Sequence, residues 1–149
     1  MRILLDTHAF LWWLDGDEQL PPTCRGLIAD EGNEVLISAA SAWEISTKVR
    51  IGKLPGAEEV AAELPEIVAM QGFDPLPISV AHAQRAGALP GPHRDPFDRM
   101  LAAQAQAESV AIVSNDPAFD GFGVPRIWDQ AERSDERGIP RSTPKKRRR

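Results

Sequence analysis

Residues 110–116 read VAIVSND, a run of small and branched aliphatic residues that ends abruptly at polar positions. A run of this length and composition is typical of a strand that is buried on both faces of a parallel sheet. Near the start of the chain, residues 2–6 (RILLD) change in the same way from aliphatic residues to an acid. An aspartate therefore lies just beyond the carboxyl end of each predicted strand: Asp6 after the first and Asp116 after VAIVS.

Strands and helices are expected to alternate along the rest of the chain. Three more short strands are predicted at residues 34–38 (EVLIS), 74–79 (DPLPIS) and 124–128 (VPRIW), and the prolines of the second suit a sheet edge. Helical patterns and end signals predict helices over residues 7–14, 21–32, 39–54, 56–72 with a break near Pro65, 80–89 and 95–108. This alternation predicts an α/β fold, in which helices cover both faces of a parallel sheet.

The ligand crevice of an open parallel sheet lies beyond the carboxyl ends of its strands. If the first strand and the VAIVS strand are central neighbours, Asp6 and Asp116 face the same crevice. Two further acids belong to adjoining elements: Glu44 lies in the helix after EVLIS, and Asp98 lies one turn into the helix before VAIVS. The topology therefore offers a shared position for four acids that are far apart in the sequence.

Each of these acids also has a structural explanation. Asp6 and Asp116 precede expected helical turns and are suited to cap them, because a carboxylate accepts hydrogen bonds from the free N–H groups there. Glu44 completes the capping-box pattern SAWE at residues 41–44. Capping alone, however, does not require acids on neighbouring elements at one edge of a sheet.

The segment HRDPFDR, residues 93–99, places two aspartates at one helix start. Asp95 precedes a proline and is the better cap, whereas Asp98 can turn away from its own backbone into the crevice. Converging carboxylates repel one another, so some must stay protonated or bind a cation. Mg²⁺ or Mn²⁺ prefers such oxygen ligands and can activate a water for phosphodiester cleavage.

Composition sets outer limits on the protein. Its 149 residues, 42% of them hydrophobic, fit one domain with a full core, expected over residues 1–131, followed by a flexible basic tail over 132–149. The formal net charge is −5, but the last nine residues hold six Lys or Arg, so residues 1–140 carry 11 basic and 22 acidic groups. An acidic body is unusual for a nucleic-acid binder, whereas acids gathered in one cleft describe a metal site.

The expected compartment is the cytoplasm. The single cysteine, Cys24, excludes a disulfide framework and favours a reducing environment. No apolar run approaches the roughly 18 residues that span a bilayer, so no membrane association is expected. A D-x-D motif after the first strand and a G-x-x-x-x-G-K-[ST] phosphate loop are both missing from the sequence, which argues against two other phosphate-handling α/β folds.

Four blocks of the sequence resemble the PIN-domain ribonucleases, specifically the VapC-type toxins of bacterial toxin–antitoxin pairs. The blocks are ILLDTHAFLWWL, ISAASAWEISTKVRIGKL, HRDPFDRMLAAQA and AIVSNDPAF, and together they cover about residues 2–128. The acids in them are those selected above from the topology. The tail from about Arg141 lies outside the shared pattern.

The resemblance implies an α/β/α sandwich with a central five-stranded parallel sheet. It also implies Mg²⁺- or Mn²⁺-dependent endonucleolytic cleavage of RNA, a homodimer, and a small cognate antitoxin that occupies the active site. By resemblance the catalytic, metal-binding set is Asp6, Glu44, Asp98 and Asp116, with Glu44 acting directly or through water. Ser114 stands where the family often has a Ser or Thr near the metal.

Several other side chains have two interpretations. Arg99 could contact phosphate, or it could pair with Asp95 one turn back or with another surface acid. Lys48, Arg50 and Lys53 form a basic strip that could hold an RNA backbone or could simply be solvated. The three histidines lack metal-ligand spacing with one another.

Trp12, Trp13 and Trp43 are expected to be core or dimer contacts rather than platforms for base stacking.

Two rival functions remain at this point. One is a non-catalytic acidic α/β domain that only binds a partner, and the other is a metal nuclease directed at DNA, because no sequence feature reads the 2′-hydroxyl.

Overall fold

The computed structural model describes residues 1–129, which fold around one parallel sheet. Its strands are β1 (Arg2–Leu5), β2 (Glu34–Ser38), β3 (Asp74–Leu76), β4 (Ala111–Val113) and β5 (Arg126–Ile127). They lie in the order β3-β2-β1-β4-β5, and every neighbouring pair is parallel. The predicted five-stranded parallel sheet is confirmed, and β3 lies at an edge, as its prolines indicated.

Helices connect the strands. They are α1 (Thr7–Asp15), α2 (Pro22–Ala29), α3 (Ala39–Arg50), α4 (Glu58–Ala62), α5 (Leu64–Met70), α6 (Val80–Ala88), α7 (Pro96–Glu108) and the 3₁₀ helix η1 (Pro117–Phe122). The break expected near Pro65 separates α4 from α5, with the proline in the first turn of α5, where a missing N–H is harmless. The predicted basic tail, residues 132–149, and the last two residues of the predicted domain lie outside the described residues.

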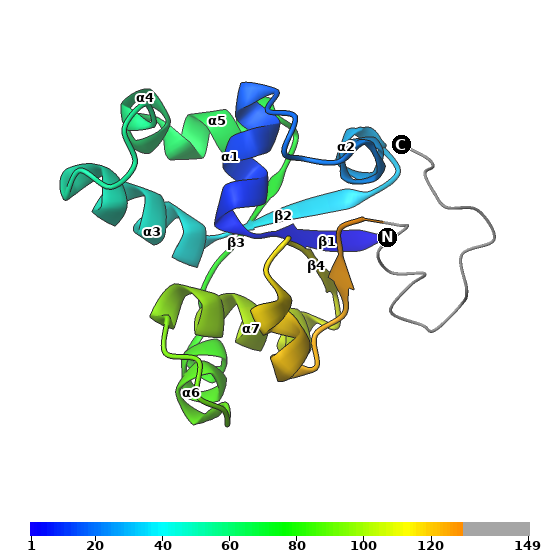
Figure 1. Cartoon of the computed structure of the whole chain (residues 1–149), viewed down its shortest axis with the longest axis vertical. Helices are drawn as coiled ribbons and strands as arrows, with labels where there is room; N and C mark the ends of the chain where they lie inside the picture. The colour runs from blue at the N-terminus through cyan, green and yellow to red at the C-terminus, as the bar shows by residue number, and fades with distance from the viewer. Residues whose placement is uncertain (130–149) are drawn as a thin grey trace, which may run out of the picture.

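The helices cover both faces of the sheet (Figure 1). One core cluster joins strand residues such as Ile3 and Leu5 to Phe10 of α1 and to α2, α3 and α5. A second joins Leu4 and Ile112 to α7 and η1 on the opposite face. Consecutive residues of a strand point to opposite faces, so the unbroken aliphatic runs of β1 and β4 fill both cores. The arrangement is the expected α/β/α sandwich.

The centre of the sheet fixes the position of the crevice. β1 and β4 pair through Leu5 and Val113, and the backbone N–H of Asp6 donates to the carbonyl of Val113 at 3.1 Å. The connections run in opposite directions from these two strands, since β2 and β3 lie on one side and β5 on the other. Such a switch point opens a crevice beyond the strand ends.

One capping prediction is wrong. The N-cap of α3 is Ser38, whose hydroxyl accepts from the Ala40 N–H at 2.9 Å. Glu44 therefore lies in the second turn of α3, too far along to form a capping box with Ser41.

None of the helices in residues 1–129 is long and apolar enough to cross a membrane.

Candidate active site

Five acids line one pocket of about 510 Å³ at the carboxyl edge of the sheet. The lining residues are Asp6, Thr7, His8, Trp12, Glu44, Lys48, Asp95, Asp98, Asn115 and Asp116. The acids come from the ends of β1 and β4, from α3, and from the start of α7. The structure thus brings together all four acids selected from the sequence and adds the expected cap Asp95.

Asp6 is almost completely buried at the floor of this pocket, with 7% of its surface exposed. One carboxylate oxygen caps α1 by accepting from the Ala9 N–H at 2.8 Å. Burial raises the pKa of Asp6 from 3.8 to about 6, against the opposing effects of hydrogen bonds from Ser114 and Ala9 and of nearby His8. The charge of Asp98 adds to the rise. Capping and pocket lining are therefore two roles of one side chain.

Asp98 interacts electrostatically with every other acid of the pocket. Burial raises its pKa, a hydrogen bond from His93 opposes this, and the charges of Asp95, Glu44 and Asp116 raise it further. Its carboxylate contacts His93 Nε2 at 3.0 Å, whereas Asp95 caps α7 by accepting from the N–H groups of residues 97 and 98. Of the two predicted roles, that of Asp95 as the cap of α7 is confirmed.

Glu44 is buried and held on both oxygens. Thr7 Oγ1 donates to one oxygen at 2.6 Å, and Lys48 Nζ donates to the other at 2.5 Å. The Thr7 hydroxyl has one hydrogen and also contacts the Ser41 hydroxyl at 3.0 Å, so it accepts from Ser41 while donating to Glu44. Burial lowers the pKa of Lys48, but the hydrogen bond and charge of Glu44 more than offset this and raise it overall.

Asp116 and Ser114 form the fourth side of the site. Asp116 caps η1 by accepting from the Ala118 N–H at 2.9 Å. Ser114 is fully buried, accepts from the Asp116 N–H at 3.0 Å and hydrogen-bonds to Asp6. Ser114 therefore lies behind the two carboxylates and fixes their positions, rather than lining the pocket itself.

Arg99 does not line this pocket, and it forms no ion pair with Asp95 in residues 1–129; its contact with phosphate stays a prediction. Its guanidinium donates to the backbone carbonyls of Ala86, Leu89 and His93. These contacts tie the end of α6 and the following loop to α7. All the nitrogens of the guanidinium are thus directed away from Asp95 and from the acids.

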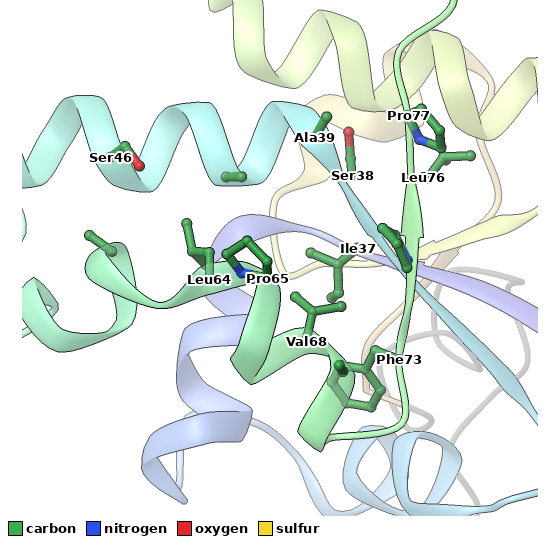
Figure 2. Close-up of a pocket in the computed structure, with 14 residues that line it drawn as sticks. Ile37, Ser38, Ala39, Ser46, Leu64, Pro65, Val68, Phe73, Leu76 and Pro77 are labelled. Atoms are coloured by element: carbon green, nitrogen blue, oxygen red, sulfur yellow. The ribbon is translucent and has the colours of Figure 1, made fainter.

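A second pocket, of about 560 Å³, has no acid or base in its lining. It lies at the β3 edge of the sheet, between β2, α3, α5 and β3 (Figure 2). Ile37, Leu64, Val68 and Phe73 are among its lining residues. Without a titratable group this pocket offers no acid–base or metal chemistry.

The comparisons with known proteins agree with this fold. The sequence profile of the PIN domain matches residues 3–124, which includes every acid of the pocket. The chain belongs to the PIN domain family. The α/β/α sandwich and the five-stranded parallel sheet are therefore those of a PIN domain.

One relative of this PIN domain is named as a ribonuclease. Ribonuclease VapC16 of Mycobacterium tuberculosis is 40% identical over 68 residues, which cover 46% of this chain and 48% of that protein. The chain thus spans about half the length of the curated relative it matches.

Solved structures share the PIN fold at low sequence identity. VapBC2 from Rickettsia felis, bound to a promoter DNA fragment, has a TM-score of 0.65 and 20% identity, covering 87% of this chain and 100% of that one. VapC20 of Mycobacterium tuberculosis, a toxin that cleaves the sarcin–ricin loop, has a TM-score of 0.64 and 14% identity, covering 85% and 99%.

The donor atoms of this PIN domain suit a hard divalent cation. All the candidate ligands are carboxylate oxygens. Burial raises the pKa of Asp6 and Asp98, and the charges of neighbouring carboxylates add to the rise, a conflict that Mg²⁺ or Mn²⁺ would relieve. Within residues 1–129, however, no three His, Cys, Asp or Glu side chains are positioned together as metal ligands. Lys48 and His93 hold oxygens of Glu44 and Asp98, so the acids share the pocket without yet forming a coordination sphere.

Sequence reasoning missed the hydrogen-bonding partners of the acids. Thr7 is buried and donates to Glu44, and buried Ser41 hydrogen-bonds to Thr7. His93 contacts Asp98 from the loop before α7. Two of these had a local signal, since Thr7 directly follows Asp6 and Ser41 lies one helical turn before Glu44. His93 comes from an irregular loop, whose path no periodicity indicates.

If the acids of this pocket bind a divalent ion that supports phosphodiester cleavage, Thr7→Val should lower that activity about 10- to 100-fold without unfolding the protein, because loss of a hydrogen bond that orients a metal-site carboxylate has an effect of this size. Thr7→Ser keeps the hydroxyl and should retain activity. Initial cleavage rates and thermal melts of both variants check this. Equal rates for Thr7→Val and Thr7→Ser would show that the hydroxyl does not orient Glu44.

Proposed function

We propose that this chain is a metal-dependent endoribonuclease and the toxin of a toxin–antitoxin pair. The observation that carries the proposal is the single pocket at the switch point of a PIN-domain sheet, lined by acids from four separate parts of the chain. The 40% identity to Ribonuclease VapC16 supports RNA as the substrate.

The acids would divide the work by position. Asp6, Asp98 and Asp116 would hold the principal ion, Mg²⁺ or Mn²⁺, because they lie around the ends of β1 and β4. When bound, such an ion activates water and stabilises the charge that develops on the leaving oxygen. Glu44, which Thr7 holds by a hydrogen bond, would bind through water or orient the attacking water.

The remaining polar groups would support these acids. Ser114 fixes Asp6 and the backbone of Asp116, so both carboxylates keep their places while the pocket charge changes. Lys48 pairs with Glu44, and His93 hydrogen-bonds to Asp98. We expect Lys48 and His93 each to lose contact with a carboxylate oxygen when the ion binds, because the ion competes for the same oxygen.

Two partners belong to the proposal. A cognate antitoxin would neutralise the activity, and a second copy of the chain would form a homodimer. Both rest on the resemblance to VapC-type toxins and on the match to Ribonuclease VapC16. Light scattering of the purified chain, alone and after co-expression with the protein of the neighbouring gene, tests both.

Divalent-metal dependence is the first test of the activity. A mixed RNA pool should be cut in Mg²⁺ or Mn²⁺, and EDTA should abolish cutting until metal is restored. Mapping the cut ends by sequencing gives the site preference, and a DNA pool of the same sequences provides the comparison. Cutting of DNA alone would replace RNA with DNA as the substrate, and absence of any metal-dependent cutting would leave the non-catalytic binding domain.

A further inference from the structure

One lysine lines the acidic pocket. Lys48 lies in α3, one turn after Glu44, and within residues 1–129 it gives the pocket its only Lys or Arg side chain. Its Nζ donates to a carboxylate oxygen of Glu44 at 2.5 Å, with 29% of the Lys48 side chain and 6% of the Glu44 side chain exposed. Pairs of this spacing on a solvated helix face add little to stability. Support of the helix alone therefore does not explain a lysine inside the pocket.

The amino group of Lys48 belongs to the side of the pocket that α3 and α7 form. Besides Glu44, it interacts electrostatically with Asp95 and Asp98 at the start of α7. The remaining acids of the pocket follow β1 and β4. One divalent ion would neutralise two of the five carboxylates, so a phosphate that enters still meets an excess of negative charge. The charge of Lys48 therefore favours phosphate binding even when an ion is present.

Aromatic rings hold the lysine in this place. Lys48 Nζ lies 6.0 Å from the centre of the Phe97 ring, a distance at which a cation and an aromatic ring attract each other. Phe97 packs edge-on against Trp43, with ring centroids 4.8 Å apart and planes at 71°. Because 59% of the Trp43 surface is exposed, it is not a core residue, which was one of its two expected roles. The ring of Phe97 limits the movement of Lys48, so its charge stays at the pocket.

A second divalent ion would need the oxygens that Lys48 faces. Two-ion nucleases hold their ions about 3.5–4 Å apart, so that both the attacking and the leaving oxygen lie near a cation. On the α3 side of this pocket, an ammonium group already lies within hydrogen-bonding distance of Glu44. Two cations crowded among the same carboxylates repel each other. A lysine is a compact point charge that binds phosphate well, so Lys48 can supply this second charge itself.

Resting on the proposed nuclease function, we propose that Lys48 takes the place of a second metal ion and binds a non-bridging oxygen of the scissile phosphate, so that one divalent ion per chain suffices. As Glu44 turns from Lys48 toward the strand ends, the freed Nζ donates to the phosphate. In the hydrolysis, the water oxygen bonds to phosphorus and the bond to the leaving sugar oxygen breaks, with its electron pair passing to that oxygen. Solvent takes the proton of the water and protonates the leaving oxygen. Lys48 keeps its own protons and is a catalytic residue through its charge.

The number of bound Mn²⁺ ions provides a test that does not depend on cleavage. Calorimetric titration of the metal-free full chain should give one Mn²⁺ per chain for the wild type. Lys48→Met should bind two, because the carboxylates that faced the lysine become available to a second ion. Lys48→Arg keeps the charge and should bind one. Arg85→Met removes an exposed positive charge on α6, outside the pocket, and should also bind one.

Single-turnover cleavage, on an RNA that the wild type cuts, tests the contact with phosphate. Lys48→Met should be slower about 100-fold, because loss of one group that stabilises transition-state charge has an effect of this size or larger. Lys48→Arg should keep most of the rate, and Arg85→Met should keep all of it. Sulfur in place of the oxygen that Lys48 contacts should slow the wild type and have little further effect on Lys48→Met, since contacting groups are not additive.

A second variant guards against loss of the fold. Lys48→Gln keeps an N–H donor for Glu44 but has no charge, so it should behave like Lys48→Met in both experiments. Thermal melts of every variant in EDTA report on folding. If Lys48→Met does not fold, the Mn²⁺ count and the cleavage rate of Lys48→Gln decide the question.

The outcomes separate this inference from the proposed function. A wild type that cuts no RNA with any divalent ion would overturn both. A wild type that cuts RNA and binds two Mn²⁺ with Lys48 in place would overturn the inference alone, and so would full activity of the uncharged variants. If the effects of Lys48→Met and of sulfur at either non-bridging position simply multiplied, Lys48 would act only by orienting Glu44, and the phosphate contact would be excluded.

Discussion

Asp98→Asn is expected to lower RNA cleavage at least about 100-fold while leaving the fold intact. Changes to residues that merely orient metal ligands lower activity about 10- to 100-fold, so loss of a ligand should exceed that range. Asp98 interacts with every other acid of the pocket, which makes it the residue whose charge matters most. Asn has nearly the same shape and keeps an oxygen for His93, so the packing of α7 should not change.

Two other aspartate variants serve as controls for this prediction. Asp95→Asn keeps a good cap for α7 and should lower activity much less than Asp98→Asn. Asp74→Asn, at the exposed edge strand β3, should have no effect. Single-turnover rates at saturating Mg²⁺, with circular dichroism as a check on folding, measure all three. If Asp98→Asn and Asp74→Asn were equally active, Asp98 would have no part in the chemistry.

Asp6→Asn is expected to stabilise the metal-free protein near neutral pH while abolishing its activity. The pKa of Asp6 is about 6 in the folded state, against an ordinary value of 3.8, so the folded protein binds the proton more tightly than the unfolded chain does. Stability from this group is therefore full below about pH 4 and is lost as the pH rises through 6. A shift of this size corresponds to about 3 kcal/mol.

The asparagine variant has no charge at residue 6, so its stability should not fall as the pH rises through 6. In EDTA at pH 7.5, Asp6→Asn should melt several degrees above the wild type, and at pH 4 the two should melt together. Asn also keeps the cap on α1, so the comparison isolates the charge. Saturating Mg²⁺ should raise the melting temperature of the wild type and leave that of the variant nearly unchanged.

Thermal melts across this pH range, with and without Mg²⁺, provide the measurement. A variant less stable than the wild type in EDTA at pH 7.5 would show that the ionised carboxylate stabilises the fold. In that case Asp6 would be a structural cap and not a strained ligand.

Much of the fold could be predicted because the central strands appear in the sequence as clear aliphatic runs. The aliphatic runs of β1 and β4 require burial on both faces, and only a parallel sheet between helix layers provides it. The order of the strands is a different matter, since it depends on how the helices pack and not on any single segment. The shared crevice depends on β1 and β4 being neighbours, which the sequence argument had to assume. The structure shows that these two strands pair.

The site shows the same limit. The acids could be selected because they follow strands or begin helices, yet Glu44 was misread as part of a capping box, because Ser38 competes for the N-cap of α3 and takes it. Arg99 was expected to contact phosphate or an acid such as Asp95, but its guanidinium donates to the carbonyls of Ala86 and Leu89 at the end of α6. Exposure could not be predicted either: Trp43 follows a helical pattern that fits a core position as well as a surface one.

The central claim is that acids from separate parts of the chain bind a shared divalent ion. The most direct measurement is the anomalous scattering of Mn²⁺ in crystals of the protein grown with that ion. The account predicts a peak of anomalous density in the acidic pocket, contacted by Asp6, Asp98 and Asp116, with Glu44 released from Lys48. Saturating Mn²⁺ that left the pocket empty, with Glu44 and Asp98 still paired to Lys48 and His93, would contradict it.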